Sequence, residues 1–333
     1  MIEPARVLNG TAPPADWERA ARQLLRALRG QRSQVAFSRR LGYRSNPIAD
    51  WEAGRRFPTA AEMLRAAARA GVDVPSAFAG FDASTAAHVG DADDQGVADW
   101  MSTWRGGATL QEVAERCDCS RYAVGRWLSG KTRPRVPDFL RLVEALTGRA
   151  ADLVAELVDI SQVPSLAPLR ERNQALRTLE EEVPWASAVL LLLRSDTYLD
   201  LPAHRPGWLG NRLGLTAEQE AQSLDLLEAV GGIAWDGTRY RPLQPGLVHP
   251  STATEGMAHW TQMAEKRLQT PTDRDRFSGV VFLTDDAGFE QVREAVRQTM
   301  QRLGAHNSEN ASRVGVVQVA VMDLSAAQPS NTL

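Results

Sequence analysis

Apolar positions along this chain recur with the spacing of short amphipathic helices, and one such pattern occurs twice. Trp51 and Trp127, which lie 76 positions apart, close the two copies. The first copy runs over residues 33–52 and the second over residues 110–128. Apolar side chains fall at matched places: Phe37 with Val113, Leu41 with Cys117, Tyr43 with Cys119, and Ile48 with Val124. Each copy therefore predicts two short helices joined by a tight turn.

Further helical patterns flank both copies. One helix is expected from Asp16 to Gly30 and another from Thr59 to Gly71; the second copy is flanked by helices near Val97 and from Val136 onward, with one more over 153–158. The Pro-rich residues 1–15 lack periodicity and are expected to form a tail, whereas residues 83–95 are small and acidic, as in a linker. We therefore expect two helical units, over 16–83 and 97–160.

The pattern changes after Pro184. A charged connecting helix over 169–182 precedes three expected helices, over 186–193, 208–213 and 216–230. Two β-prone runs then flank Asp236-Gly237, a two-residue link typical of a hairpin. Three helices followed by a hairpin predict a winged-helix-like unit, which we place with the connecting helix at 165–246.

The last region predicts a small α+β domain over 247–325. A helix over 250–270 is followed by a strand Ser278–Thr284, a helix Ala287–Leu303 and a strand Val314–Leu324, which together predict a β-α-β unit. Residues 306–311 are expected to form a loop and 326–333 to be disordered. The predicted fold class is thus mainly α: two N-terminal helix-turn-helix bundles, a winged-helix-like unit and a small α+β domain.

The charge distribution favours a polyanionic partner for the two repeated units. The net charge is −3, but residues 1–83 carry 13 basic and 8 acidic side chains. Residues 105–135 carry seven basic and three acidic side chains. Because only two of the 38 basic residues are Lys, abundant Arg alone means little; its clustering on the repeats indicates attraction to phosphates.

The second copy has the residue types expected of a helix pair that contacts the bases and phosphates of DNA. Ala114 is small where the two helices must touch, Asp118 stands at the turn, and the Ser120 hydroxyl can cap the second helix. The positions predicted to face bases are Ser120, Arg121, Tyr122 and Arg126, since Arg can donate two hydrogen bonds to guanine. Lys131, Arg133 and Arg135 follow and are predicted to meet phosphates.

The first copy has matching positions but weaker chemistry. Ser38 is the small residue and Gly42 the turn residue. The predicted base readers are Arg44, Ser45 and Asn46, with Arg55, Arg56 and Gln34 placed for phosphates. Asp50 would face the polyanion and Pro47 restricts the start of the helix, so this copy can also be a repeat kept for packing or dimerisation.

These residues resemble the Xre/Cro-type helix-turn-helix family. The matching stretches are Arg40-Leu41-Gly42, residues 48–58 and residues 120–134, which place two such domains in tandem. The resemblance implies a transcriptional regulator that binds double-stranded DNA as a homodimer. Residues 165–325 resemble a bacterial family of putative regulators with a C-terminal domain of unknown function, on Trp208–Thr216, Leu227–Ile233, Arg276–Gly279 and Val314–Leu324. That region is expected to dimerise or to sense a small-molecule or peptide effector.

Other function classes find little support in the sequence. Cys117 and Cys119 fall on apolar positions and are expected to be buried thiols, and the five His are scattered without metal spacing, so we expect no metal site, no cofactor and no enzyme. No segment predicts a membrane span or a signal peptide, and we expect a cytoplasmic protein. The main alternative is a protein-interaction module of antitoxin or anti-repressor type, in which the repeats bind a partner protein. A third interpretation is that the C-terminal region is an enzyme.

Overall fold

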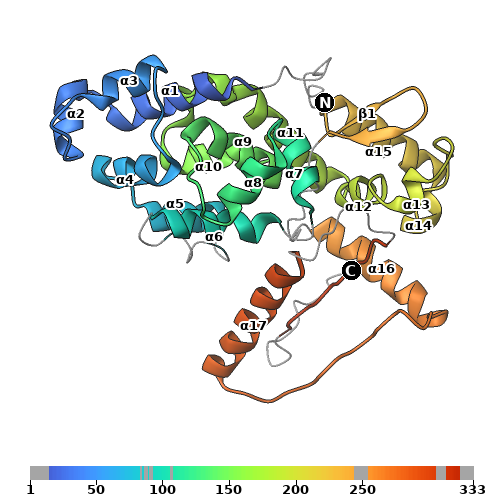
Figure 1. Cartoon of the computed structure of the whole chain (residues 1–333). Coiled ribbons are helices and arrows are strands. Elements are labelled where there is room, and N and C mark those ends of the chain that lie inside the picture. Colours follow the sequence, from blue (N-terminus) through green and yellow to red (C-terminus); the bar gives the residue numbers. More distant parts are fainter. Residues whose placement is uncertain are drawn as a thin grey trace, which may run out of the picture.

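The computed structural model describes residues 15–82, 85, 89, 93–105, 108–243, 254–304 and 313–322. Within these residues the chain is mainly helical with one two-stranded sheet, and its buried side chains form two hydrophobic cores. The first core extends from Ala20 to Leu169, and the second from Leu176 to Ile233 (Figure 1). Residues 1–14 of the predicted tail 1–15, most of the linker 83–95, the loop 306–311 and the end 326–333 lie outside the described residues.

The first repeat comprises five helices, whose ends are set by local capping. They are α1 (Trp17–Arg29), α2 (Gln34–Arg40), α3 (Pro47–Ala53), α4 (Ala60–Ala70) and α5 (Val74–Phe81). Asp16 caps α1 through its side chain, and Gly30 ends that helix, as the sequence predicted. Thr59 and Glu62 form a reciprocal capping box at the start of α4, and Gly71 ends it in the left-handed conformation.

The second repeat has the same plan. Its helices are α6 (Asp94–Arg105), α7 (Leu110–Arg116), α8 (Arg121–Leu128), α9 (Val136–Thr147) and α10 (Ala150–Leu157). An offset of 76 superposes the bounds of α2 on those of α7, and those of α5 on those of α10. Because α3, the second helix of the first pair, begins at Pro47, Arg44 and Ser45 lie in the turn before α3 and not on the helix itself, which corrects the sequence-based placement.

The two repeats are joined to the second core by short 3-10 turns η2 (Ile160–Gln162) and η3 (Pro164–Leu166) and by α11 (Ala167–Glu182). The second core contains α12 (Ala186–Leu192), α13 (Asp196–Leu199), α14 (Gly210–Leu213) and α15 (Ala217–Ala229). The predicted hairpin is present as β1 (Ile233–Trp235) and β2 (Tyr240–Pro242), antiparallel with Trp235 opposite Tyr240.

The hairpin link is longer than predicted. Four residues, 236–239, connect the strands, not the two residues Asp236 and Gly237 alone. The Asp236 carboxylate accepts hydrogen bonds from the backbone N–H groups of Thr238 and Arg239, both at 2.9 Å, and this holds the wider turn closed.

The predicted C-terminal β-α-β unit is wrong for the described residues. Helices α16 (Thr254–Gln269) and α17 (Asp286–Gly304) form as expected, and the Asp285 carboxylate accepts from the N–H of Gly288 at the start of α17. Residues 278–284 and 313–322 are not strands, however.

The reason is that these two segments do not pair with each other. The Gln318 amide donates to the Met257 carbonyl (3.1 Å) and to the Thr261 hydroxyl (2.7 Å), so residues 313–322 are attached to α16 through Gln318. Residues 278–284 are left exposed, and the Leu283 side chain is 100% exposed. A strand needs a neighbouring strand for its backbone groups, and among the described residues neither segment pairs with one.

Candidate nucleic-acid interface

The turn between the paired helices has the conformation that the sequence indicated. Gly42 has φ +87°, and Asp118, at the matching place, has φ +46°; Asp118 is the one non-glycine residue with positive φ among those described. Ser38 and Ala114 are both buried where the helices meet. The helix pairs α2–α3 and α7–α8 are therefore held by equivalent close contacts.

The outer face of α8 presents three large polar side chains to solvent. Arg121, Tyr122 and Arg126 are exposed, Tyr122 at 69%. The Arg121 guanidinium lies 5.0 Å from the centre of the Tyr122 ring and donates to its hydroxyl at 3.1 Å, so the two side chains support each other. The opposite face of α8 buries Val124 and Leu128. This arrangement leaves the charged face of α8 open to a partner.

The start of α8 is capped as predicted. The Ser120 hydroxyl accepts a hydrogen bond from the N–H of Ala123 at 3.2 Å. This bond uses one acceptor position of the hydroxyl to hold the start of the helix, and the hydroxyl proton remains available to be donated.

The basic residues that follow α8 differ in what they contact. Lys131 is exposed. Arg133 forms an ion pair with Asp94 at 2.8 Å, although its side chain remains 65% exposed. Arg135 donates to the carbonyl oxygen of Phe57 in the first repeat at 2.9 Å. These three residues follow α8 in the chain, and two of them make contacts within the protein.

In the first repeat, charge on α3 is partly neutralised. Arg44, Ser45, Arg55 and Arg56 are exposed. Arg55 pairs with Asp50 at 2.5 Å, so the acid that would repel phosphate has a cationic neighbour. The Asn46 side-chain carbonyl accepts from the buried Ser38 hydroxyl at 2.8 Å, which ties Asn46 to α2.

Gln34 belongs to a buried polar network that the sequence analysis missed. Its amide donates to the Glu52 carboxylate at 2.8 Å, and Arg29 donates to the same carboxylate at 2.5 Å and 3.3 Å. Glu52 is only 4% exposed. The comparison of the repeats carried the signal, because Leu110 and Leu128 stand where the first copy has Gln34 and Glu52. A polar pair thus replaces an apolar one between α2 and α3.

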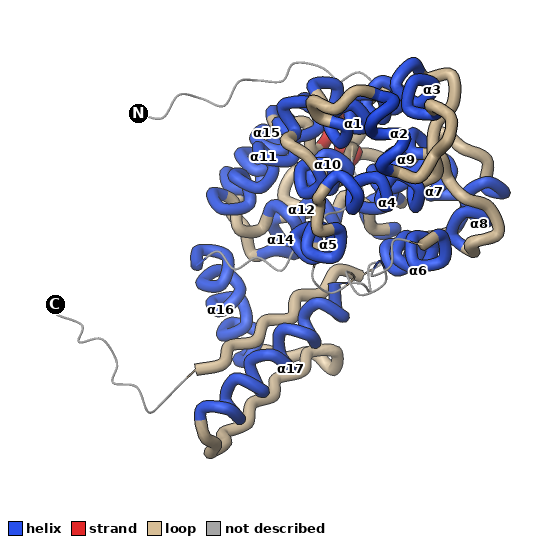
Figure 2. The backbone as a smooth tube through the Cα atoms, turned by 90° about the vertical axis from the view of Figure 1, so that its left-hand side faces the viewer, coloured by secondary structure: helices blue, strands red, loops and turns tan. Residues whose placement is uncertain are grey.

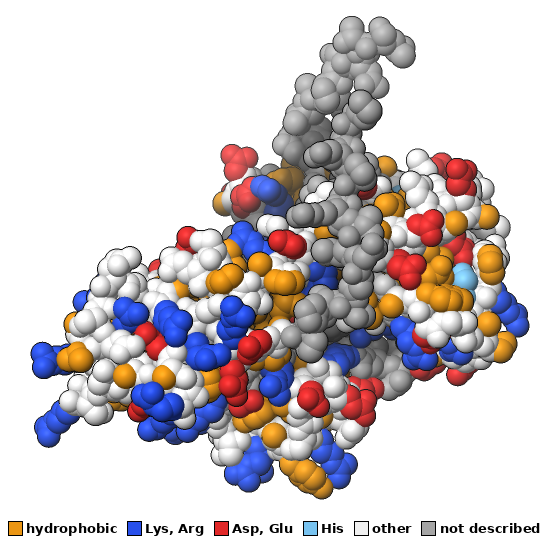
Figure 3. Space-filling view, turned by 90° about the horizontal axis from the view of Figure 1, so that it is seen from above, with side chains coloured by type: hydrophobic (Ala, Val, Ile, Leu, Met, Phe, Trp, Pro, Cys, Tyr) orange, Lys and Arg blue, Asp and Glu red, His pale blue; other side chains and the backbone are white. Residues whose placement is uncertain are grey.

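Charged side chains are unevenly distributed over the surface. Figure 3 shows Lys and Arg side chains gathered over the end of the molecule that carries α1 to α3. In the second core, α15 carries Glu218, Asp225 and Glu228 and no basic residue. Glu220, the fourth acid of α15, is buried and accepts from the N–H groups of Gly207 (2.9 Å) and Gly210 (2.6 Å). The helix α15 is therefore unsuited to approach phosphate.

The second core also contains a group of aromatic side chains around His204. The hydroxyl of Tyr198 lies 3.2 Å from His204 Nδ1, and the rings of Trp235 and Tyr240 pack edge-on, with centres 4.9 Å apart. Burial lowers the pKa of His204, and Glu220 opposes this shift. Trp208 and Tyr198 are buried, whereas Trp235 is 46% exposed. These rings chiefly form core, with one open edge.

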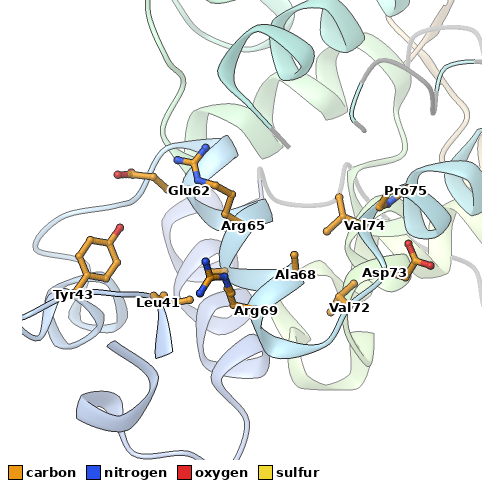
Figure 4. Close-up of a pocket in the computed structure, with 11 residues that line it drawn as sticks. Leu41, Tyr43, Glu62, Arg65, Ala68, Arg69, Val72, Asp73, Val74 and Pro75 are labelled. Atoms are coloured by element: carbon orange, nitrogen blue, oxygen red, sulfur yellow. The ribbon is translucent and has the colours of Figure 1, made fainter. Parts of the chain in front are cut away.

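A cavity of about 540 Å³ lies on the first repeat, between the α2–α3 turn and the α4–α5 corner. Leu41 and Tyr43 line one side and Val72 to Pro75 the other, with Arg65 and Arg69 between them (Figure 4). In the second repeat, the matching corner is covered by α11: Arg172 pairs with Glu144 at 2.7 Å, and Asn173 donates to the Gly148 carbonyl at 3.1 Å. The same surface is thus covered on one repeat and open on the other.

Within the described parts of the chain, no group of three or more His, Cys, Asp or Glu side chains is arranged to hold a metal ion. Cys117 is buried and Cys119 half-buried, both as free thiols, and burial raises the pKa of Cys117 to about 12. Among the described helices, none is both long enough and apolar enough to span a bilayer.

Comparison with known proteins agrees with the geometry of the second repeat. No curated protein and no solved structure matches the chain. Residues 102–157, from within α6 to the end of α10, match a helix-turn-helix domain family. This part of the chain is a helix-turn-helix domain, the kind of domain found in DNA-binding regulators.

Proposed function

We propose that this protein is a sequence-specific transcription regulator that binds double-stranded DNA through both repeats. One observation carries the proposal: Arg121, Tyr122 and Arg126 are all exposed on α8, inside the segment that matches a helix-turn-helix domain family. In such domains the second helix enters the major groove and its outer side chains meet base edges. Regulation would then follow from occupancy of the site.

Each exposed side chain has a distinct role in this proposal. Arg121 and Arg126 donate to guanine, and Tyr122 holds Arg121 in place while contacting the groove. Lys131, Arg133 and Arg135 neutralise phosphates beside the groove and so fix the register of α8. In the first repeat, Arg44 and Ser45 read bases from the turn before α3, and Arg55 and Arg56 meet phosphates. Gln34 acts through Glu52 to position α3.

The test is a gel-shift assay against genomic fragments at two salt concentrations. Replacing Arg121 by Ala should weaken binding to the selected fragment by about 1–3 kcal/mol and blunt discrimination at one base pair. Binding to random DNA should change far less. An equal loss on both DNAs would show that Arg121 touches only the backbone, and an absence of any preferred fragment would refute the proposal.

The C-terminal region is proposed to associate with a second copy or to sense an effector. Apolar side chains exposed on residues 280–283 and 316–322 support association, because exposed patches of this kind are typical of interaction sites. The winged-helix-like unit, with the open edge of its aromatic group at Trp235, supports binding of a small molecule or peptide. Sedimentation of the full chain and of the Val281→Asp variant tests the first idea; an unchanged mass would refute it.

A second candidate function is protein binding through the first repeat. The open cavity beside α4 and α5 favours it, since α11 covers the matching surface of the second repeat. In that case a partner helix would occupy the first repeat, and the gel shift would show no preferred fragment at either salt concentration.

A further inference from the structure

The two repeats meet around an internal two-fold axis. The N–H of Ala60 donates to the carbonyl of Pro134 at 3.0 Å, and the N–H of Val136 donates to the carbonyl of Pro58 at 3.0 Å. Between these bonds, Thr59 and Arg135 form an antiparallel bridge. Each pair of partners is exchanged by the same offset of 76, which is the reciprocity expected of a two-fold interface.

The rest of the interface obeys the same exchange. Helix α1 of the first repeat packs on α9, and α6, its counterpart in the second, packs on α4. Helix α4 contacts α9, its counterpart in the second repeat, and α5 contacts its counterpart α10. The axis therefore passes between the two helices of each of these pairs. A homodimer of helix-turn-helix domains has an interface of this self-complementary kind; here a single chain supplies both halves.

Burial makes this arrangement rigid. A single core runs through both repeats, and aromatic rings interlock across the boundary: Phe78 of α5 packs on Trp100 of α6 with ring centres 4.9 Å apart, and Phe81 packs on Trp104 at 5.6 Å. Because these contacts are apolar and close-packed, the repeats form one body instead of two tethered ones.

The axis places the two reading helices together on one side of the molecule. The segments that leave α3 and α8 lead directly to the paired residues 58–60 and 134–136. Helices α3 and α8 lie along the same edge of the tube in Figure 2. When two helix-turn-helix domains are related by a two-fold axis, they read two half-sites of opposite orientation at one spacing.

The two readers are unequal in chemistry. The second presents Arg121, Tyr122 and Arg126, whereas the first presents Arg44 together with an Asp50–Arg55 ion pair. We infer that one chain binds one site made of two inverted half-sites that differ in sequence, with α3 on one half and α8 on the other. This inference rests on the proposed function and adds the shape of the site and the number of chains that fill it.

The experiment uses the full chain and a site selected from random DNA. Arg126→Ala and Arg44→Ala should each weaken binding by roughly 10-fold to 100-fold and should each erase selection in a different half of the site. Arg276→Ala removes the same charge from an exposed place far along the chain and serves as the control, with little change expected. At saturation, each chain should take up one site.

Altered spacing tests the rigid axis. Insertion of five or of ten base pairs between the half-sites should reduce affinity to that of a single half-site, because a rigid body cannot follow either change. Tolerance of the ten-base-pair insertion would indicate tethered domains and overturn the inference. So would one symmetric site for every two chains, or loss of selection in the same half with both variants. If no sequence is selected at all, the proposed function itself fails.

Discussion

The buried carboxylate of Glu52 offers a stringent test of how the first repeat holds α3 in place. Replacing Glu52 by Gln keeps the shape of the side chain but removes its charge. Arg29 then loses the ion pair in which it now donates at 2.5 Å and 3.3 Å. Because Gln has one acceptor oxygen in place of two, the donors of Arg29 and Gln34, which now share both oxygens, cannot all be satisfied. Because Glu52 is 4% exposed and the Arg29 side chain 21% exposed, little water is available to replace these contacts.

The expected cost follows from this burial. Removing one partner of a buried ion pair costs about 3–5 kcal/mol of unfolding free energy, because the other charge stays buried. Arg29 is partly accessible, so the lower end, about 3 kcal/mol, applies. For a cooperative unit of the size of the two repeats, this cost lowers the Tm by roughly 6–12 °C.

Thermal unfolding followed by circular dichroism measures the change, and the same helix supplies the control. Asp50→Asn removes an ion pair of equal length on α3, but its side chains are 64% and 49% exposed. Such a pair contributes about 0–1 kcal/mol, so the Tm should hardly move. Gln34→Leu combined with Glu52→Leu copies the apolar pair Leu110 and Leu128 and should recover part of the loss. A Glu52→Gln variant as stable as Asp50→Asn would refute the reasoning.

Three further predictions concern pH, thiol chemistry and salt. Burial lowers the pKa of His204, so its contribution to stability is complete above its ordinary value of 6.5 and is lost as the pH falls toward the folded pKa. Urea unfolding at pH 7.5 and pH 5 should show this loss, smaller in His204→Gln. The buried Cys117 thiol, with a pKa of about 12, should be alkylated much more slowly than Cys119 at pH 8, as read by mass spectrometry of the folded protein. Arg133→Ala should flatten the salt dependence of DNA binding by about one unit, whereas Asp94→Asn, which releases Arg133 from its ion pair, should strengthen binding at low salt.

One result would contradict each of these three predictions. Equal pH dependence in the wild type and in His204→Gln would place the acid sensitivity elsewhere. Equal alkylation rates for the two thiols would contradict the burial of Cys117. A salt slope unchanged by Arg133→Ala would mean that this side chain remains with Asp94 when DNA is bound.

Local elements were predictable because their signals act over a few residues. Asp16, Thr59 and Ser120 cap their helices through bonds to groups three residues away, and apolar spacing alone indicates which face is buried. The repeat offset of 76 likewise predicted the turn geometry at Gly42 and Asp118. The exposed face of α8 followed from the same periodicity.

Distant contacts were not predictable in this way. The C-terminal strands failed because strand formation requires a pairing partner, and residues 313–322 are attached to α16 instead. Asn46 and Gln34 look like DNA contacts in sequence, yet the fold ties them to Ser38 and Glu52. Such pairings depend on which side chains become neighbours after folding.

The sequence by itself therefore determined that two similar helical units exist, that each carries paired short helices, and that the second presents Arg121, Tyr122 and Arg126. The tertiary structure alone decided that the units share one core around a two-fold axis, with Ala60 bonded to Pro134 and Val136 to Pro58. The physical reason is range: capping and periodicity are properties of adjacent residues, whereas an interface depends on shape and burial between segments far apart in the chain.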